Sequence, residues 1–338
     1  MFRIVNLKSQ VSNLIQVSII GKDIQEAKRL LERGDLVAIP TETVYGLAGN
    51  ALDGNTVTKI FSVKERPFFD PLIVHVPDLK SVDKWVTHIP AKAKKLAEAF
   101  WPGPLTLLLP RKSVIPDIVT AGLETVGIRC PKNEVTQQLL RSIDFPLAAP
   151  SANPFGYVSP TNPHHVNEQL GNKINYIVDG GECQVGIEST IVGFENDSPV
   201  VFRLGGLSIE DIERVAGKVD IQLNSSSNPK APGQLRSHYA PRKKLLVGSL
   251  TELLSHYGNQ VSVVAYKNPL REVELSNQRI LSPKGKLEEA AQNLFSALRE
   301  LDKLAPPIII AEEVPNVGIG RAINDRLYRA AAQEGNRQ

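Results

Sequence analysis

The sequence has little cysteine, few aromatic residues and no large excess of either charge sign. Cys130 and Cys183 are its two cysteines, and its 338 residues contain no Cys-x-x-Cys pair. This pattern excludes a disulfide framework and a cysteine-based zinc site, and it is typical of a reducing cytoplasm. The net charge of +3 is compatible with an anionic ligand but is far below the basic excess of a dedicated nucleic-acid-binding protein.

Long apolar runs are also missing. No stretch is long enough to cross a bilayer, and the first residues lack the apolar segment of a signal peptide, so we expect a cytoplasmic protein without membrane contact. A hydrophobic content of 42% with 22% charged residues is typical of globular proteins. The length of the chain predicts two domains.

Several signature motifs are absent. The sequence has no Gly-x-x-x-x-Gly-Lys-Ser/Thr phosphate loop, no Gly-x-Gly-x-x-Gly after a strand and no Gly-x-Ser-x-Gly elbow. Ser151 and Ser189 are therefore poor candidates for a nucleophile. His164 and His165 are adjacent at a helix start, and their side chains diverge by about 100° around the axis, so a shared metal is not expected. A nucleotide, if bound, must be held by the side chains of a non-standard site.

Apolar periodicity predicts helices and strands along the first 215 residues. The helices are expected over 23–33, 55–63, 91–100, 134–141 and 209–215, with another starting after a cap at Asn162. The strands are expected over 36–39, 72–76, 105–109, 125–129, 146–149, 176–178, 188–192 and 200–204. Because few helices separate these strands, a mixed, open twisted sheet is more consistent with the pattern than a regular doubly wound one.

The composition changes between residues 219 and 242. Residues 224–229 are typical of a linker, but 231–241 include a His-Tyr pair between prolines, which is unusual in a simple tether. Beyond it, strands over 245–247, 261–265, 280–281 and 308–311 alternate with helices over 287–303 and 322–332. The pattern predicts a first domain over 1–218, a linker over 219–242, and a smaller three-layer α/β domain with a parallel sheet over 243–338.

The segment Lys64-Glu65-Arg66-Pro67 gives the first indication of chemistry. If it is extended, Lys64 and Arg66 project to the same side, an arrangement that suits a polyanion such as a triphosphate. Other polar side chains stand at the ends of predicted strands, where α/β sheets bind ligands. They are Thr41, Thr43, His75, Arg129, Ser151, Asn153, Ser159, Ser189 and Arg203. Taken together they favour one anionic-ligand cleft.

Each of these residues also has an ordinary explanation. The stretch 40–47 is equally consistent with a capped turn, and Ser151 with a helix or turn cap. A lone histidine such as His75 is more often a satisfied core residue than a ligand. The joint pattern, rather than any single position, is what indicates a site.

Six ordered segments resemble the motifs of the YrdC-like family. They are Pro40–Leu47, Lys64–Pro67, Pro71–Val76, Trp101–Thr106, Pro150–Asn153 with Gly156 and Ser159–Thr161, and Glu188–Val192. Pro232-Gly233, His238–Pro241 and Gly320–Leu327 resemble the longer, two-domain form of that family. The resemblance implies an open twisted α/β sheet around a deep positive cleft, a Rossmann-like C-terminal domain and a linker that lies over the active site.

The resemblance also implies an activity. Members of the family are ATP-dependent nucleotidyltransferases that form L-threonylcarbamoyl-AMP from L-threonine, bicarbonate and ATP, with release of pyrophosphate, as the first step of the t6A modification of tRNA. Mg²⁺ is expected with ATP, held by the phosphates more than by the protein. tRNA or the downstream t6A-transferase complex is an implied partner. The alternative, an RNA-binding or regulatory module with a cationic groove, is disfavoured by the near-neutral charge and the lack of aromatic stacking motifs.

The family motifs assign roles to individual residues. Lys64 and Arg66 are the implied catalytic residues, acting on the phosphates. The implied ATP ligands are Lys64, Arg66, Asp70, Thr125, Ser151, Asn153, Ser159, Arg203 and Tyr239. The implied threonine ligands are Thr43, His75, Arg129, Ala149 and Ser189.

Three of these assignments have a specific physical reason or difficulty. Arg129 offers the planar fork that suits a carboxylate. Asp70 departs from the family pattern, in which Asn is expected. A carboxylate at this position would repel a triphosphate unless it faces the metal or Arg66. Tyr239, together with His238, is expected to reach into the nucleotide site and close it as a lid.

Overall fold

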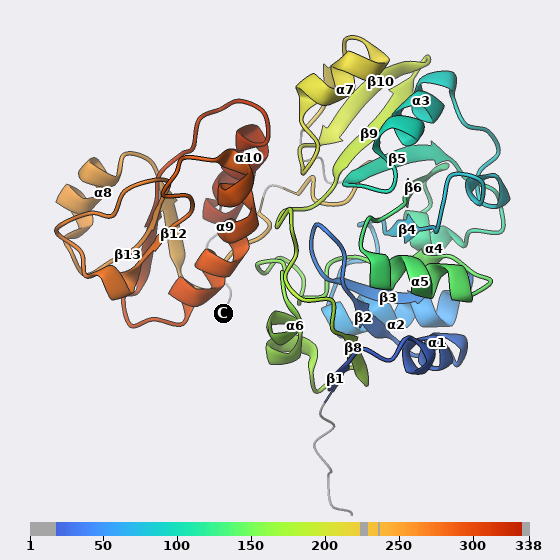
Figure 1. Cartoon of the computed structure of the whole chain (residues 1–338), viewed down its shortest axis with the longest axis horizontal. Helices are drawn as coiled ribbons and strands as arrows, with labels where there is room; N and C mark the ends of the chain where they lie inside the picture. The colour runs from blue at the N-terminus through green and yellow to red at the C-terminus, as the bar shows by residue number, and fades with distance from the viewer. Residues whose placement is uncertain (1–17, 224–228, 236, 333–338) are drawn as a thin grey trace, which may run out of the picture.

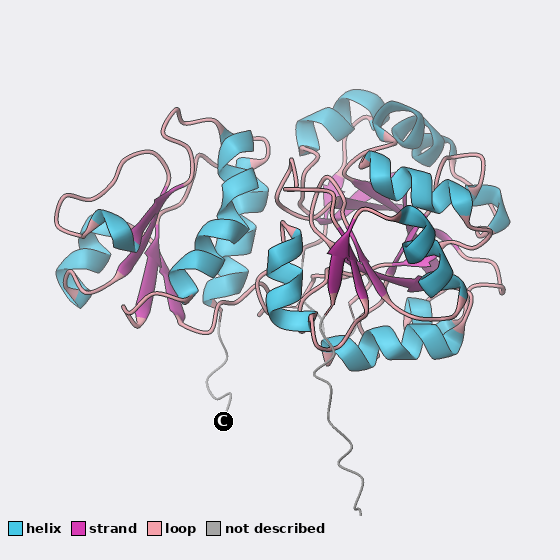
Figure 2. Cartoon of the chain, turned by 60° about the horizontal axis from the view of Figure 1, so that its bottom comes forward, coloured by secondary structure: helices cyan, strands magenta, loops and turns pink. Residues whose placement is uncertain are grey.

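The computed structural model describes residues 18–223, 229–235 and 237–332 (Figure 1). The serine-rich part of the predicted linker, residues 224–228, lies outside the described residues. The chain forms two α/β units, and Figure 1 shows the smaller C-terminal unit facing the larger one through α9 (Leu287–Asp302) and α10 (Gly320–Ala331). In both units the helices surround the strands (Figure 2).

The first unit is built on one mixed sheet with the strand order β1-β8-β2-β3-β7-β4-β6-β5-β9-β10-β11. Its strands are β1 (Ile19–Gly21), β2 (Val37–Ile39), β3 (Gly46–Asn50), β4 (Ile73–His75), β5 (Leu105–Pro110), β6 (Thr125–Arg129), β7 (Leu147–Ala148), β8 (Tyr176–Val178), β9 (Thr190–Glu195), β10 (Ser198–Arg203) and β11 (Asp220–Ile221). Strand β6 pairs parallel with β4 and antiparallel with β5. The mixed sheet expected from the sequence is confirmed.

Helices cover this sheet, and all but α3 and α4 begin at polar caps. They are α1 (Ile24–Glu32), α2 (Gly54–Lys64), α3 (Ala91–Phe100), α4 (Asp117–Thr120), α5 (Glu134–Ser142), α6 (Pro163–Leu170) and α7 (Ile209–Ala216). Asp23, Asp53, Asn133, Asn162 and Ser208 accept backbone N–H groups at the helix starts, which satisfies donors that have no partner within the helix.

The second unit is a four-stranded parallel sheet between helices. The strands are β12 (Lys244–Val247), β13 (Ser262–Ala265), β14 (Gln278–Ile280) and β15 (Ile308–Ala311), in the order β12-β15-β13-β14. Helix α8 (Leu250–Tyr257) lies on one side of the sheet, and α9 and α10 lie on the other (Figure 1). The predicted parallel, three-layer arrangement is therefore confirmed.

The two units share a hydrophobic core. Val44, Val158 and Ile187 of the first unit pack in one cluster with Tyr239 of the linker and the buried face of α9 and α10. Arg299 of α9 is 2% exposed and donates hydrogen bonds to the carbonyl oxygens of Val158 (2.6 Å) and Ser159 (3.2 Å). The second unit is thus packed directly against the segment that follows β7.

Two local predictions were wrong. The segment from Lys64 to Arg66 is not extended, because α2 continues through Lys64 and Glu65 adopts a left-handed conformation with φ of 55°. The N–H of Glu65 there caps the carbonyl oxygens of the last helical turn. Strand β3 was not expected, because its Gly-rich sequence lacks apolar alternation. Gly49 is needed there, since a Cβ would lie 2.6 Å from Thr56 of α2.

Candidate active site

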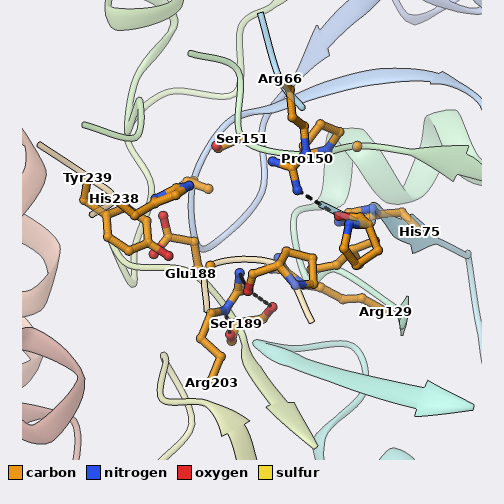
Figure 3. Close-up of a pocket in the computed structure, with 16 residues that line it drawn as sticks. Arg66, His75, Arg129, Pro150, Ser151, Glu188, Ser189, Arg203, His238 and Tyr239 are labelled. Atoms are coloured by element: carbon orange, nitrogen blue, oxygen red, sulfur yellow. Dashed lines mark hydrogen bonds between the residues drawn. The ribbon is translucent and has the colours of Figure 1, made fainter. Parts of the chain in front are cut away.

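A small cavity of about 50 Å³ lies between the first domain and the linker (Figure 3). Its lining residues come from β4, from the ends of β6 and β10, from the loops before β3, between α2 and β4, after β7 and before β9, and from the linker. They are Val44, Arg66, Pro71, Ile73, His75, Arg129, Ala149, Pro150, Ser151, Glu188, Ser189, Arg203, Pro232, Gly233, His238 and Tyr239. Most of the residues implicated by the sequence therefore meet at one place.

The strand register explains why the amino-acid side of the cavity forms. His75 on β4 is paired with Arg129 on β6, and Arg129 is paired with Thr106 on β5. Residues paired directly across neighbouring strands point to the same face of a sheet. The hydroxyl of Thr106 lies 2.8 Å from the hydroxyl of Ser189, so Ser189 is fixed beside the same row.

Arg129 is held by a carboxylate to which the sequence had assigned no role. Its Nη2 donates to Glu42 Oε1 at 2.8 Å, and Glu42 Oε2 accepts the backbone N–H of Lys132 at 2.9 Å. Both side chains of the ion pair are 5% exposed. The Nε of Arg129 has no hydrogen-bond partner among the described residues, so one donor of the guanidinium remains for a ligand.

His75 is a neutral imidazole in this environment. Burial, together with the nearby charge of Arg129, lowers the pKa of His75 to about 3. Its Nδ1 is buried without a hydrogen-bond partner in the described structure. A buried polar atom without a partner is costly, and here it belongs to a cavity-lining residue.

Lys64 is next to the cavity but does not line it. Its ammonium group donates to the carbonyl oxygens of Ser151 (2.5 Å) and Asn153 (2.6 Å), and only 1% of the residue is exposed. Burial and the charge of Arg66 lower its pKa well below the ordinary value. The Asn153 side chain bonds to the carbonyl oxygens of Pro154 and Tyr157. In this conformation Lys64 therefore fixes the loop that presents Ser151.

Arg66 lines the cavity and forms a buried ion pair with Asp70. The distance from Arg66 Nη2 to Asp70 Oδ2 is 2.9 Å, and Asp70 is 0% exposed. Arg66 also donates to the carbonyl oxygens of Asp70 (3.1 Å) and Pro71 (2.8 Å). Burial raises the pKa of Asp70, although Arg66 opposes that change. Asp70 thus faces Arg66, one of the two arrangements in which its charge is tolerable beside phosphates.

Arg203 connects the sheet to the linker. It donates to the carbonyl oxygen of Ser189 (3.0 Å), to the hydroxyl of Ser189 (3.0 Å) and to the carbonyl oxygen of Pro232 (3.3 Å). Burial lowers its pKa from the ordinary value. Figure 3 shows Arg66, Arg129 and Arg203 entering the cavity from different sides.

The linker closes the cavity with an aromatic pair. Tyr239 is 1% exposed, and its ring centroid lies 4.1 Å from that of His238. Neither the Tyr239 hydroxyl nor His238 Nδ1 has a hydrogen-bond partner in the described part of the chain. Burial, and next the charge of Arg66, lower the pKa of His238 well below its usual value. Residues 229–235 and 237–242 therefore lie over the site.

The remaining predicted residues do not line this cavity. Ser159 donates to Glu188 Oε1 at 2.6 Å, so it is one residue away from the cavity. Thr43 shares a 2.8 Å hydrogen bond with Thr41 and directly precedes the cavity-lining Val44. Thr125 lines a second cavity, of about 620 Å³, with Leu108 on β5. The sequence also missed Glu188 as a cavity residue; its position directly before Ser189, at the start of β9, was the available signal.

Neither a metal-binding cluster nor a membrane-spanning helix is found among the described residues. They contain no group of three or more His, Cys, Asp or Glu side chains placed to hold a metal ion. None of their helices combines the length and the hydropathy needed to span a membrane.

Known proteins share both units of the chain. Residues 29–205 match the Sua5/YciO/YrdC family model, described as telomere recombination, and residues 207–332 match the model of the threonylcarbamoyl-AMP synthase C-terminal domain. Threonylcarbamoyl-AMP synthase of Pyrococcus abyssi is 40% identical over 91% of this chain and 94% of the relative. The Bacillus subtilis enzyme of that name is 39% identical over 94% of this chain and 95% of the relative.

A solved structure agrees with these matches. The crystal structure of P. abyssi Sua5 complexed with L-threonine has a TM-score of 0.85 and 39% sequence identity, and the match covers 92% of this chain and 96% of that one. The likeness extends over both units and the linker between them. The chain therefore belongs to the Sua5/YrdC family of threonylcarbamoyl-AMP synthases, in the form that carries the additional C-terminal domain.

Proposed function

We propose that the chain forms L-threonylcarbamoyl-AMP from L-threonine, bicarbonate and ATP, releases pyrophosphate, and so supplies the t6A modification of tRNA. The observation that supports this most directly is the set of buried polar atoms without hydrogen-bond partners at the cavity. They belong to His75, Arg129, His238 and Tyr239. Buried polar groups are normally satisfied, so these atoms are explained best as ligand contacts.

The threonine half of the reaction fits the His75 side of the cavity. The free Nε of Arg129 suits the threonine carboxylate. Neutral His75 and the hydroxyl of Ser189 are placed to bond the polar groups of the amino acid. A solved relative is described as a complex with L-threonine. Thr43 and the backbone of Ala149 complete the proposed threonine set.

The chemistry needs no covalent enzyme intermediate. The threonine amine attacks the carbon of bicarbonate, and loss of water gives a carbamate. A carbamate oxygen then attacks the α-phosphorus of ATP, and pyrophosphate leaves. Negative charge builds on the phosphate oxygens during that step, so fixed cations stabilise the transition state. Arg66 and Arg203 are the cavity-lining cations on that side, with Ser151 beside them.

ATP requires the linker to move. A cavity of about 50 Å³ is much smaller than the roughly 300–1,000 Å³ of typical ligand pockets. The second cavity, which Thr125 lines, lies on the same sheet face, since Thr125 and Arg129 are an even number of residues apart on β6. We propose that the linker opens to admit ATP and closes again over the bound triphosphate, and that the nucleoside extends toward Thr125.

Magnesium is proposed to arrive with ATP. Glu188 is the carboxylate that lines the cavity, and its two oxygens already accept hydrogen bonds from Ser159 and Arg326. Asp70 is 0% exposed, and its carboxylate already pairs with Arg66 at 2.9 Å. Such a donor set suits an ion bound mainly by phosphate oxygens. The bound ion would neutralise charge on the phosphates.

The alternative of an RNA-binding module gains no support from the structure. Lys64, Arg66, Arg129 and Arg203 are each at most 7% exposed. An RNA backbone cannot reach side chains this deeply buried without a large rearrangement, so they do not form the exposed cationic groove on which that alternative depends.

The test is pyrophosphate release by the full-length protein with ATP and Mg²⁺. Release should require both L-threonine and bicarbonate, and mass spectrometry should detect threonylcarbamoyl-AMP. Reactions without threonine, without bicarbonate, or with serine in place of threonine are the controls. Release that is independent of threonine or of bicarbonate would contradict the proposal.

A further inference from the structure

Arg326 of helix α10 is fully buried and reaches from the C-terminal domain to the wall of the active site. It is 0% exposed. Its Nε donates to Glu188 Oε2 at 2.8 Å, and its Nη2 donates to the carbonyl oxygen of Leu204 at 2.8 Å. Its guanidinium carbon lies 4.7 Å from the centroid of the Tyr239 ring. One side chain of the second domain therefore contacts two cavity-lining residues of other segments.

Both contacts lead to residues proposed to bind ATP. Glu188 accepts the hydroxyl of Ser159 through its other oxygen at 2.6 Å. Arg326, Glu188 and Ser159 thus form a continuous hydrogen-bonded chain from α10 to the loop before α6. The ring of Tyr239 lies against the same guanidinium, in the geometry of a cation–π contact. Arg326 itself does not line the cavity.

The local charges keep the guanidinium ionised. Although burial alone lowers the pKa of a guanidinium, the neighbouring Tyr239, Glu188 and Asp325 raise the pKa of Arg326 above its ordinary value. Asp325 also accepts hydrogen bonds from Arg329, whose Nη1 donates to the linker carbonyl oxygen of Leu235 at 2.7 Å. Helix α10 therefore holds the linker main chain as well as its tyrosine ring.

We propose that Arg326 is a positioning residue for the ATP half of the reaction. Its Nε hydrogen bond fixes the carboxylate of Glu188, and with it the hydroxyl of Ser159, while its guanidinium plane fixes the Tyr239 ring over the cavity. The C-terminal domain thereby completes the nucleotide site. This inference rests on the proposed function for its kinetic consequence, but the contact with the linker can be tested without any substrate.

The experiment compares three variants of the full-length protein. Arg326→Met keeps most of the side-chain length and removes the charge and the donors, Arg326→Lys keeps the charge but not the fork, and Lys303→Met is the control. Lys303 also bridges the two domains, through a 2.7 Å ion pair with Glu168, but it is exposed and distant from the cavity residues. Unmodified protein is assayed first, so that a missing reaction is recognised as failure of the proposed function alone.

Two readouts separate positioning from general stability. For Arg326→Met we expect the KM for ATP to rise about tenfold or more, the scale of one lost charged hydrogen bond, while the KM for threonine stays within about twofold. Without substrate, protease should cut the segment 229–242 faster in Arg326→Met than in Lys303→Met. Arg326→Lys should recover part of both effects. Equal changes in the two KM values, or unchanged linker cleavage, would overturn the proposal.

A charge-balanced pair of substitutions guards against a folding defect. Arg326→Met leaves Glu188 buried without its cation, which is destabilising, whereas Arg326→Met combined with Glu188→Gln removes both charges. If Arg326 acts through Glu188, the double variant should show the KM for ATP of the worse single variant. Effects that multiply would mean independent action and would overturn the proposed chain.

Discussion

The carboxylate of Glu42 lies 2.8 Å from the guanidinium of Arg129, and in this buried ion pair Arg129 is the member that lines the cavity. Glu42 belongs to the loop before β3, and Arg129 ends β6, so the pair joins two distant segments. It occupies Nη2 of Arg129 and leaves Nε without a partner. The geometry therefore orients Arg129 toward the cavity while compensating part of its charge.

Replacing Glu42 by Gln should make threonine a stronger stabiliser of the protein. The substitution leaves Arg129 as an uncompensated buried charge, and breaking such a pair costs about 3–5 kcal/mol. A ligand carboxylate placed at Arg129 restores the missing counter-charge. We therefore expect a lower melting temperature for Glu42→Gln without ligand, and a larger upward shift on saturation with L-threonine than in the unmodified protein.

The matched control is Glu168→Gln, which removes the exposed partner of Lys303. Exposed ion pairs contribute at most about 1 kcal/mol, so this variant should show the same threonine shift as the unmodified protein. If threonine stabilises Glu42→Gln no more than the control, Arg129 does not face the threonine carboxylate.

Lys64→Met should lower the free energy of unfolding. The ammonium group bonds the carbonyl oxygens of Ser151 and Asn153, and loss of a charged donor to buried acceptors costs about 1.5–3 kcal/mol per bond. Lys59→Met is the control, because Lys59 lies on the same helix and makes one hydrogen bond, to Gly34, at the surface. Its effect should stay near 0.5 kcal/mol.

Denaturant unfolding of the two lysine variants measures the difference. A stability of Lys64→Met equal to that of Lys59→Met would contradict a role for Lys64 in fixing the 151–153 loop. Its importance would then come from direct contact with phosphate alone.

The sequence predicts best where local chemistry decides the structure. Asn162 caps the start of α6 as expected, because its side chain accepts the backbone N–H of His165. Pro163, the first residue of the helix, has no backbone N–H that would require a partner. The apolar run at β4 and the alternation at β6 also predict their strands. By contrast, β3 contains Gly46 and Gly49, which are required by close packing against other segments rather than by any local preference for a strand.

The sequence indicated many of the residues that meet at the cavity, but not their contacts. Residues such as Arg66, His75 and Arg203 meet at one cavity because each stands at a strand end or a helix end. The partner of each cation is set by tertiary packing. Glu42 lies 87 residues from Arg129 in the chain, and Arg326 lies 138 from Glu188. No spacing rule connects positions so far apart, so the sequence indicated neither ion pair.

Stability should fall as the pH drops below about 6.5, and His165→Gln should weaken that dependence. Burial, then the charge of Arg299, lower the pKa of His165 to about 4. Between the unfolded value of about 6.5 and the folded one, only the unfolded state takes up the proton. Each such histidine therefore costs up to about 1.4 kcal/mol of stability per pH unit in this window, and His75 adds a second such contribution.

Unfolding free energies at pH 8, 6, 5 and 4.5 test this for both proteins. The pH 8 value gives the cost of the substitution itself, since the imidazole is neutral there in both states. The difference in unfolding free energy between the unmodified protein and His165→Gln should then shrink toward low pH, because the variant lacks one proton-binding group in the unfolded state. A difference that stays constant from pH 8 to pH 4.5 would contradict a neutral, buried His165.

Gly233→Ala should prevent the linker from closing and should lower turnover. Gly233 has φ of +81°, and a Cβ there would lie 2.7 Å from the Tyr239 hydroxyl and 3.1 Å from Arg203 Cδ. Gly217 is the matched control, because its φ is +78° but a Cβ would meet nothing within 4 Å. Both alanine variants bear backbone strain, because a residue with a Cβ rarely adopts a positive φ. The clash with the lid is specific to Gly233.

We therefore expect Gly217→Ala to lose stability while its kcat stays within about twofold. Gly233→Ala should lose about tenfold or more in kcat, because an open site admits water and leaves Tyr239 away from the nucleotide. Pyrophosphate release at saturating substrates measures both. Equal kcat values in the two variants would mean that the strained turn at Gly233 serves stability alone, and that closure of Tyr239 over the cavity is not part of the catalytic cycle.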